Sequence, residues 1–148
     1  MKALLTGITG YIGHQLAIKL ANNNFKINAL VRDLDSNNIP KHKNILPIKG
    51  NICDYNSVEN AVKGCDCVFH VAAFTDLKCK KIDNFYNTNV LGTENILKAS
   101  LENNIKKVVH TSTLSAFVQA IYQVPITENQ PRISSYKNDY ELTKSIAE

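Results

Sequence analysis

Residues 6–13 of this chain read Thr6-Gly7-Ile8-Thr9-Gly10-Tyr11-Ile12-Gly13 and follow a short apolar run at residues 2–6. Apolar side chains at positions 12, 16, 17 and 20 then share one face of a helix. Three glycines between a strand and a helix allow a tight turn, a close backbone approach to a pyrophosphate, and close packing of the helix on the strand. The free N–H groups and partial positive charge at the start of the helix attract phosphate. The stretch therefore predicts a dinucleotide-binding turn rather than a merely structural one.

The rest of the chain alternates strand-like and helix-like patterns, which predicts an α/β fold. The expected strands are Lys2–Thr6, Lys26–Val31, Ile45–Lys49, Cys67–Val71 and Lys107–Thr111. The expected helices run from Ile12 to residues 22–24 and over Asn56–Lys63, Ile82–Asn103 and Asp139–Glu148, with Asp54 placed to cap the second. Right-handed crossovers wind this order into a Rossmann-type, doubly wound parallel sheet with helices on both faces. We expect the sheet to stop after its fifth strand and the start of the following helix.

The composition argues against two classes of function. Of the 148 residues, 44% are hydrophobic and 20% are charged, and no apolar run approaches the ~20 residues that a membrane span needs. The 17 basic and 13 acidic residues give a net charge of +4, and the basic residues are scattered rather than gathered in a stripe with aromatic residues. We therefore expect neither a membrane span nor a nucleic-acid partner.

The N-terminus and the cysteines indicate a cellular compartment. The apolar stretch after Met1 is too short for the core of a signal peptide, and the four cysteines form no CxxC pair. Without a secretion signal a disulfide framework is not expected, and the cysteine spacing lacks the second ligand pair of a zinc site. We expect a cytoplasmic protein with free thiols and no metal site.

The end of the second expected strand indicates which dinucleotide binds. An acidic residue there would bind the ribose 2′-hydroxyl of NAD, whereas an arginine accommodates the 2′-phosphate of NADP. Arg32 stands directly after the strand, and Asp33 follows it. The pattern favours NADP over NAD, and the alternative is that Arg32 is an ordinary solvated side chain.

Near the C-terminus, Tyr140 and Lys144 are separated by one helical turn. This i, i+4 spacing places a phenol and an ammonium on the same helix face. A nearby ammonium favours the ionised phenol, so the tyrosine exchanges protons more readily. Tyr136 does not fit this role, because Tyr140 occupies its i+4 position. Taken alone, the pair could equally be an ordinary surface contact.

Six motifs extend over the whole chain in a characteristic order. They are Gly7-x-x-Gly10-x-x-Gly13, Gly50-Asn51-Ile52, Val68-Phe69-His70-Val71-Ala72-Ala73, Asn89-Val90-Leu91-Gly92-Thr93, Val109-His110-Thr111-Ser112-Thr113 and Tyr140-x-x-x-Lys144. With them, the sequence resembles an extended short-chain dehydrogenase/reductase of the epimerase/dehydratase branch. It is most similar to dihydroflavonol-reductase-like and 3β-hydroxysteroid-dehydrogenase-like members and to the hopanoid-associated sugar epimerases.

The resemblance implies a set of residues that bind NADP, which is preferred, or NAD. The pyrophosphate would be held by Gly7, Gly10, Tyr11, Ile12 and Gly13, the 2′-phosphate by Arg32, the adenine by Asn51 and Ile52, and the ribose and nicotinamide by Ala72, Ala73, Asn89, Tyr140 and Lys144. One position departs from the family pattern, because the adenine-contacting residue is usually Asp and here is Asn51. Its amide oxygen can still accept a hydrogen bond from the adenine amino group.

The resemblance also implies three catalytic residues. Thr113 would hold the substrate oxygen in place of the commoner Ser, Tyr140 would be the general acid/base, and Lys144 would support its ionisation. His70 and His110 lie in or beside expected strands, and we interpret them as core or strand-end residues rather than as catalytic ones.

Extended members of this family resemble the chain over roughly their N-terminal half and continue into a substrate-binding region. We therefore expect residues 1–148 to be the NAD(P)-binding domain of an oxidoreductase or a nucleotide-sugar epimerase/dehydratase. Its substrate would be a small molecule, such as a sugar nucleotide or a flavonoid-like or steroid-like alcohol or ketone. The alternative is a non-catalytic dinucleotide-binding or redox-sensing module. The resemblance also implies a homodimer as a further alternative, paired through the helices that carry Asn89–Ser100 and Tyr140.

Overall fold

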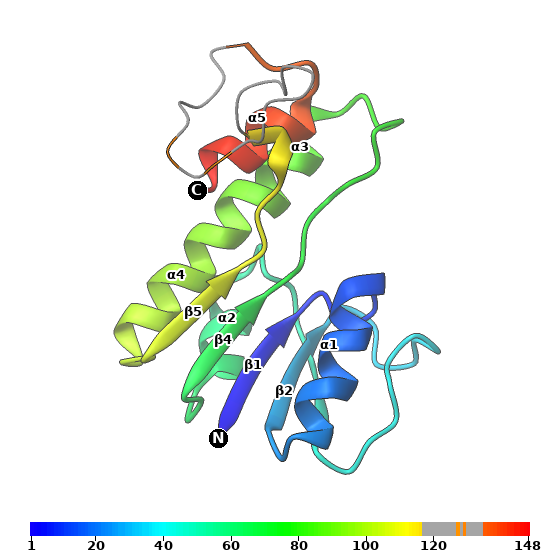
Figure 1. Ribbon diagram of the computed structural model, residues 1–148, viewed down its shortest axis with the longest axis vertical. Helices are drawn as coiled ribbons and strands as arrows, with labels where there is room; N and C mark the ends of the chain where they lie inside the picture. The colour runs from blue at the N-terminus through cyan, green and yellow to red at the C-terminus, as the bar shows by residue number, and fades with distance from the viewer. Residues whose placement is uncertain (117–126, 128, 130–134) are drawn as a thin grey trace.

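The computed structural model describes residues 1–116, 127, 129 and 135–148. Its centre is a parallel sheet of five strands, β1 (Lys2–Thr6), β2 (Lys26–Val31), β3 (Ile45–Lys49), β4 (Cys67–His70) and β5 (Lys107–His110). The strand order is β3-β2-β1-β4-β5. Figure 1 shows β2, β1, β4 and β5 side by side in this order. The order reverses between β1 and β4, as in a doubly wound sheet. The expected fold class is confirmed, and β4 and β5 each end one residue before the expected position.

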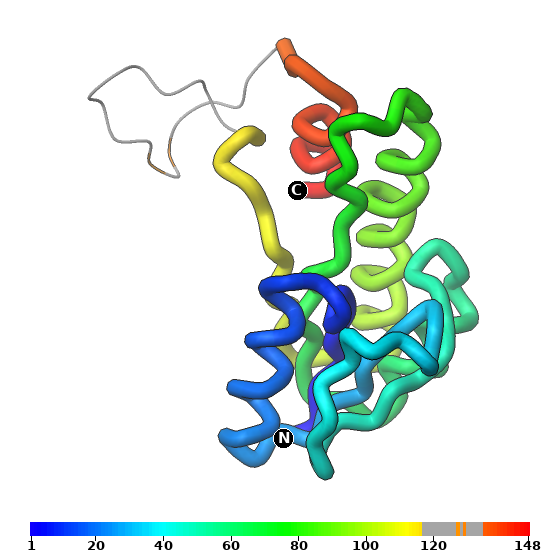
Figure 2. Tube along the Cα trace, turned by 90° about the vertical axis from the view of Figure 1, so that its right-hand side faces the viewer, coloured from blue at the N-terminus to red at the C-terminus, as the bar shows by residue number. Residues whose placement is uncertain are grey.

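Helices cover both faces of the sheet because side chains alternate along each strand. Leu5 and Ala29 pack with Ala17 of α1 (Tyr11–Asn22) on one face. Leu4 packs on the other face, with Val58 of α2 (Tyr55–Val62) and with residues of α4 (Gly92–Glu102). Figure 2 shows α1 and α4 on opposite sides of the strands. One apolar cluster therefore covers each face of the sheet.

Local signals explain the ends of two helices. The Asp54 carboxylate accepts a hydrogen bond from the backbone N–H of Asn56 at 3.1 Å, so it caps α2 as expected. The Asn138 side chain likewise accepts from the N–H of Glu141 at 2.9 Å and begins α5 (Asp139–Ile146). Within the described ranges, no helix is both long enough and apolar enough to cross a membrane.

The helix expected over Ile82–Asn103 is present, but its middle is π-helical rather than α-helical. The structure divides this stretch into α3 (Ile82–Phe85), a π-helical segment η1 (Tyr86–Leu91) and α4. In the wider π turn the carbonyl of Asn89 accepts a hydrogen bond from the Thr93 hydroxyl at 2.6 Å. At Gly92 a Cβ would lie 2.8 Å from Cδ1 of Ile52, so the start of α4 is packed closely against the residues after β3. Apolar periodicity alone does not distinguish a π turn from an α-helical one, because it contains no information about this packing.

Helix α5 packs against η1, α3 and the short 3-10 turn η2 (Leu114–Ala116). This position places α5 beyond the carboxyl end of β5 (Figure 1). In parallel α/β sheets, ligands bind in the crevice outside the carboxyl ends of the strands. The fold therefore places Tyr140 and Lys144 at the edge of the sheet where a ligand is expected.

Candidate active site

The three glycines of the β1–α1 turn meet different constraints. Gly7 has a φ of +77°, and a Cβ there would lie 2.6 Å from the backbone nitrogen of Ala72. At Gly13 a Cβ would lie 2.1 Å from the carbonyl oxygen of Gly7, so the helix can approach the turn only without a side chain. Gly10 is the N-cap of α1, provides no side-chain cap, and is followed by a first turn without acidic residues. The N–H groups of that turn are therefore suited to an anion.

A cavity of about 400 Å³ lies at the carboxyl ends of β1 to β4. Ten of the expected cofactor-binding residues line it, namely Gly7, Gly10, Tyr11, Ile12, Gly13, Arg32, Asn51, Ile52, Ala72 and Ala73. Tyr11 is 88% exposed and Ile12 58% exposed, which suits apolar side chains that a ligand covers. Three further residues that were not expected, Phe74, Thr75 and Thr88, line the cavity from the segment after β4 and from η1. In the sequence, Phe74 and Thr75 directly follow the Ala72-Ala73 motif, and Thr88 directly precedes the motif that begins at Asn89.

The two residues after β2 lie differently. Arg32 is exposed and lines the cavity. The Asp33 carboxylate accepts a hydrogen bond from the N–H of Asp35 at 3.0 Å, so it stabilises the turn that follows. Of these two residues, Arg32 lines the cavity and Asp33 does not.

Asn51 follows β3 and lines the cavity, and its side-chain oxygen already accepts one hydrogen bond within the protein. That oxygen accepts a hydrogen bond from the N–H of Cys53 at 3.1 Å. A carboxamide oxygen has two lone pairs, so one acceptor position and both amide protons of Asn51 are left for an adenine.

Asn89 lies behind the cavity rather than in its lining. It is 1% exposed. Its side-chain oxygen accepts from the N–H of Phe74 at 2.7 Å, and its amide nitrogen donates to the carbonyl of Phe74 and to the hydroxyl of Thr143, both at 3.1 Å. In this arrangement Asn89 joins Phe74, which lines the cavity, to Thr143 on α5.

Of the expected catalytic residues, Tyr140 and Lys144 lie on α5, and Thr113 lies next to a turn that packs against α5. Thr113 directly precedes η2, which packs against α5, and its hydroxyl accepts a hydrogen bond from the N–H of Ser115 at 3.3 Å. Tyr140 is partly exposed on the first turn of α5. Lys144 is 2% exposed, and its ammonium donates to the carbonyl of Thr111 at 2.7 Å and to Nε2 of His110 at 3.1 Å. The lysine head is thus held at the end of β5, and burial lowers its pKa.

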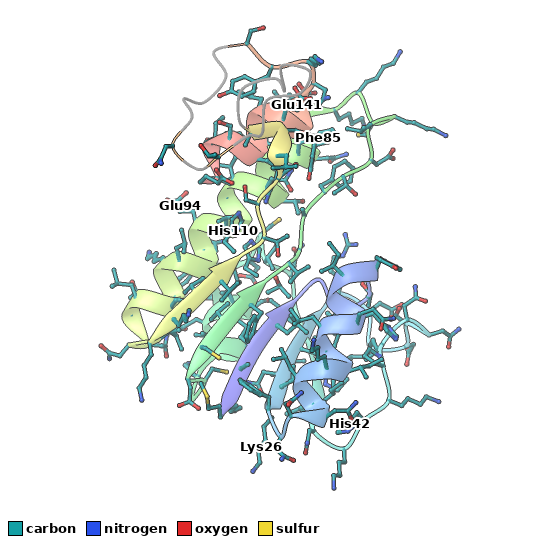
Figure 3. All side chains as sticks on the ribbon, viewed as in Figure 1. Lys26, His42, Phe85, Glu94, His110 and Glu141 are labelled. Carbon is teal, nitrogen blue, oxygen red and sulfur yellow. The ribbon has the colours of Figure 1, made fainter. Side chains whose placement is uncertain are left out.

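Two histidines occupy the interior next to this lysine. Their ring centroids are 5.1 Å apart, and His110 lies at the end of β5 (Figure 3). Burial, with a smaller effect of His110 and Lys144, lowers the pKa of His70 to about 3. Burial and the charge of Lys144 lower the pKa of His110 to about 4. Both rings are therefore neutral near pH 7, and their interpretation as core and strand-end residues agrees with their positions.

This pair makes stability depend on pH. In the unfolded chain both imidazoles bind protons below their ordinary pKa of 6.5, whereas the folded chain resists protonation until about 3 and 4. The unfolded state therefore binds more protons in this window, and the free energy of unfolding falls as pH falls. We expect urea unfolding midpoints to decrease from about pH 6.5 to about pH 4.5, with a shallower slope in His110→Gln. Equal midpoints across this range would contradict the assignment.

The strand order, the glycine turn at the point where that order reverses and the Tyr140–Lys144 helix define an extended short-chain dehydrogenase/reductase. The sequence profile of the 3-beta hydroxysteroid dehydrogenase/isomerase family matches residues 4–148, and the chain belongs to that family.

Two curated relatives are similar along the whole chain. The 4-hydroxy-2-methyl-3-oxo-4-farnesyl-3,4-dihydroquinoline-1-oxide ketoreductase of Stigmatella aurantiaca is 30% identical over 148 residues, which are 100% of this chain and 44% of the relative. The short-chain dehydrogenase/reductase family 42E member 1 of Danio rerio is 32% identical over 152 residues, 98% of this chain and 38% of the relative. The chain thus spans less than half the length of either protein.

Solved structures share the fold. The Bordetella bronchiseptica enzyme WbmH, crystallised in complex with NAD+, superposes with a TM-score of 0.85 at 26% identity. The match covers 99% of this chain and 50% of WbmH. WbmH therefore shares the fold of this chain, and its crystal structure contains a bound nicotinamide dinucleotide.

Proposed function

We propose that the whole protein is an oxidoreductase that transfers a hydride between NADP(H) and a substrate carbon bearing a hydroxyl or carbonyl group. The observation that carries this proposal is the cavity at the carboxyl ends of β1 to β4, where the glycine turn and Arg32 face the same space. Its residues fit the dinucleotide, because the uncapped start of α1 suits a pyrophosphate and Arg32 suits a 2′-phosphate. When bound, the nicotinamide would give or take the hydride.

Tyr140 is the general acid/base in this proposal. During reduction of a ketone, its hydroxyl donates the proton to the substrate oxygen, and during oxidation its phenolate accepts that proton. The Thr113 hydroxyl donates a hydrogen bond to the same oxygen. Packing of α5 on η2, which begins at the residue after Thr113, supports this joint action.

Lys144 acts on Tyr140 through its charge. It lies one helical turn further along α5, and its ammonium is buried, where a charge acts on its neighbours more strongly than in water. The hydrogen bonds from Lys144 to Thr111 and His110 fix the position of this charge. A fixed, poorly solvated cation favours the ionised form of a nearby phenol.

For the substrate we propose a ketone or a secondary alcohol. The name of the Stigmatella aurantiaca relative describes a ketoreductase, and this relative matches the whole of the present chain. Nucleotide-sugar epimerisation is the second candidate, because a UDP-glucose 4-epimerase from Thermus thermophilus in complex with NAD shares the fold with a TM-score of 0.84.

Arg32 provides the test of the cofactor. We expect the wild-type protein to bind NADPH more tightly than NADH. Arg32→Ala should weaken NADPH binding by about 1–3 kcal/mol, the cost of losing a charged hydrogen-bond partner, and should leave NADH binding nearly unchanged. Calorimetric or fluorescence titration of both dinucleotides measures the difference.

The matched control is Lys41→Ala, which removes one positive charge from the exposed loop after β2 without touching the cavity. This control separates a local contact from the effect of net charge, and it should leave both affinities unchanged. Equal affinities of the wild-type protein for NADPH and NADH would overturn the preference for NADP.

A further inference from the structure

His70 bridges two hydroxyl groups inside the protein. It is 1% exposed at the carboxyl end of β4. Its Nδ1 lies 2.7 Å from the hydroxyl of Thr6, its register partner on β1, and its Nε2 lies 3.0 Å from the hydroxyl of Thr93 on α4. Both nitrogens of a buried ring are therefore satisfied by side chains from other elements.

The directions of these hydrogen bonds follow from counting protons. The Thr93 hydroxyl donates its single proton to the carbonyl of Asn89, so it can only accept from His70, and Nε2 must carry the ring proton. Since burial keeps the ring neutral, Nδ1 is then an acceptor, and the Thr6 hydroxyl donates to it. The oxygen of Thr6 in turn accepts from the backbone N–H groups of residues 71 and 72, each at 3.2 Å.

The Thr6 side of this chain of hydrogen bonds fixes a wall of the dinucleotide cavity. Val71 and Ala72 line that cavity. The backbone of Ala72 lies so close to Gly7 that a Cβ on Gly7 would meet its nitrogen at 2.6 Å. The N–H groups held by Thr6 therefore set the separation between the glycine turn and the end of β4.

The hydrogen bond of His70 to Thr93 leads to α5, the helix that carries the proposed acid/base residue Tyr140. Thr93 holds the main-chain carbonyl of Asn89 in the π-helical segment. The Asn89 side chain accepts a hydrogen bond from the backbone N–H of Phe74 and donates one to the Phe74 carbonyl. It also donates to the hydroxyl of Thr143. Thr143 lies on α5 between Tyr140 and Lys144, so the position of α5 relative to the cavity depends on Asn89.

We propose that His70, with its proton on Nε2, is a positioning residue that couples the wall of the dinucleotide cavity to the helix that carries Tyr140. Its effect on turnover rests on the proposed function. Its effect on structure does not, because the hydrogen bonds are present in the fold itself. Thr6, Thr93 and Thr143 are the links through which His70 acts.

Two isosteric substitutions test the hydrogen bond of His70 to Thr93 and its hydrogen bond to Thr6 separately. Thr93→Val removes the acceptor of Nε2–H and frees the Asn89 carbonyl, so we expect kcat to fall about tenfold while the Kd of NADPH changes little. Thr6→Val leaves Nδ1 and two N–H groups unpaired, so we expect the Kd of NADPH to rise about tenfold. Thr93→Ser and Thr6→Ser keep the hydroxyl and should restore both constants.

Two readouts do not depend on activity. Nitrogen NMR of the imidazole of His70 should show the proton on Nε2 in the wild-type protein and in Thr93→Ser, and a changed Nε2 signal in Thr93→Val. Amide hydrogen exchange of α5 should accelerate in Thr93→Val and not in Thr93→Ser. If Thr93→Val does not fold, Thr143→Val and its serine control test the last link, with the same expected loss of kcat.

Several results would overturn the proposal. These are a proton on Nδ1 of His70 in the wild-type protein, unchanged α5 exchange in Thr93→Val, or equal losses of kcat and NADPH affinity in the Thr6 and Thr93 variants. Equal losses would indicate general destabilisation. A wild-type protein that binds no dinucleotide would instead overturn the proposed function, and the NMR and exchange measurements would still decide the role of His70.

Discussion

Gly13→Ala is expected to weaken dinucleotide binding by about a hundredfold. The added Cβ would lie 2.1 Å from the carbonyl oxygen and 2.6 Å from the carbonyl carbon of Gly7, and these backbone atoms cannot rotate away as a flexible side chain could. The first turn of α1 must move away from β1, which misplaces the N–H groups that would face the pyrophosphate. Losing one or two hydrogen bonds to a charged group weakens binding by about a hundredfold, and overpacking costs about 1–3 kcal/mol of stability.

Two other glycines provide controls for this substitution. In Gly10→Ala the nearest atom to the new Cβ is the Gly7 oxygen at 3.4 Å, so the free energy of unfolding should change by less than about 1 kcal/mol. Gly64→Ala, at a φ of +70° far from the cavity, should lower stability by about 1–2 kcal/mol and leave binding intact. Thermal melts and NADPH titration measure both effects. Unchanged binding in Gly13→Ala would contradict the assignment of the phosphate position.

Sequence reasoning succeeded where a function depends on local order along the chain. The glycine turn could be predicted because a strand, the turn and a helix are consecutive, and each glycine meets a neighbour of that same unit or the end of β4. Arg32 could be placed because a residue that directly follows a parallel strand lies at the carboxyl edge of the sheet.

The same reasoning failed where contacts between distant elements decide the structure. Residues 86–91 are π-helical, and the following Gly92 packs closely against Ile52 from the segment after β3, a contact that apolar periodicity does not contain. His70 is correctly expected to be buried, but its partners Thr6 and Thr93 come from β1 and α4. The one available signal was that Thr6 and His70 both end strands that pair in the sheet.

Lys144 shows how a residue can be placed correctly and its contacts missed. The i, i+4 spacing put it on the same helix as Tyr140, and the structure agrees. Its hydrogen bonds to Thr111 and His110 depend on how α5 packs beyond β5, which the spacing does not determine. The position of the ammonium is therefore a product of the tertiary fold.

Tyr140→Phe is expected to lower turnover of the whole protein by about 10²–10⁴-fold, the usual contribution of a general acid or base. NADPH binding should stay within about twofold of the wild-type value, because the phenylalanine ring keeps the packing of α5 and loses only the proton donor. Steady-state kinetics with a ketone substrate and NADPH, together with calorimetric titration of NADPH, measure the two quantities separately.

Tyr136→Phe is the matched control, because it removes a hydroxyl from the segment just before the same helix. The Tyr136 hydroxyl donates to Ser145 on α5 at 2.9 Å, so its loss affects stability and should leave turnover nearly unchanged. Lys144→Ala should reduce both turnover and binding, because it removes the buried charge beside Tyr140 and frees the Thr111 carbonyl and His110. Full turnover in Tyr140→Phe would refute the proton-transfer role. A wild-type protein that binds NADPH without any turnover would favour a dinucleotide-binding module over an enzyme.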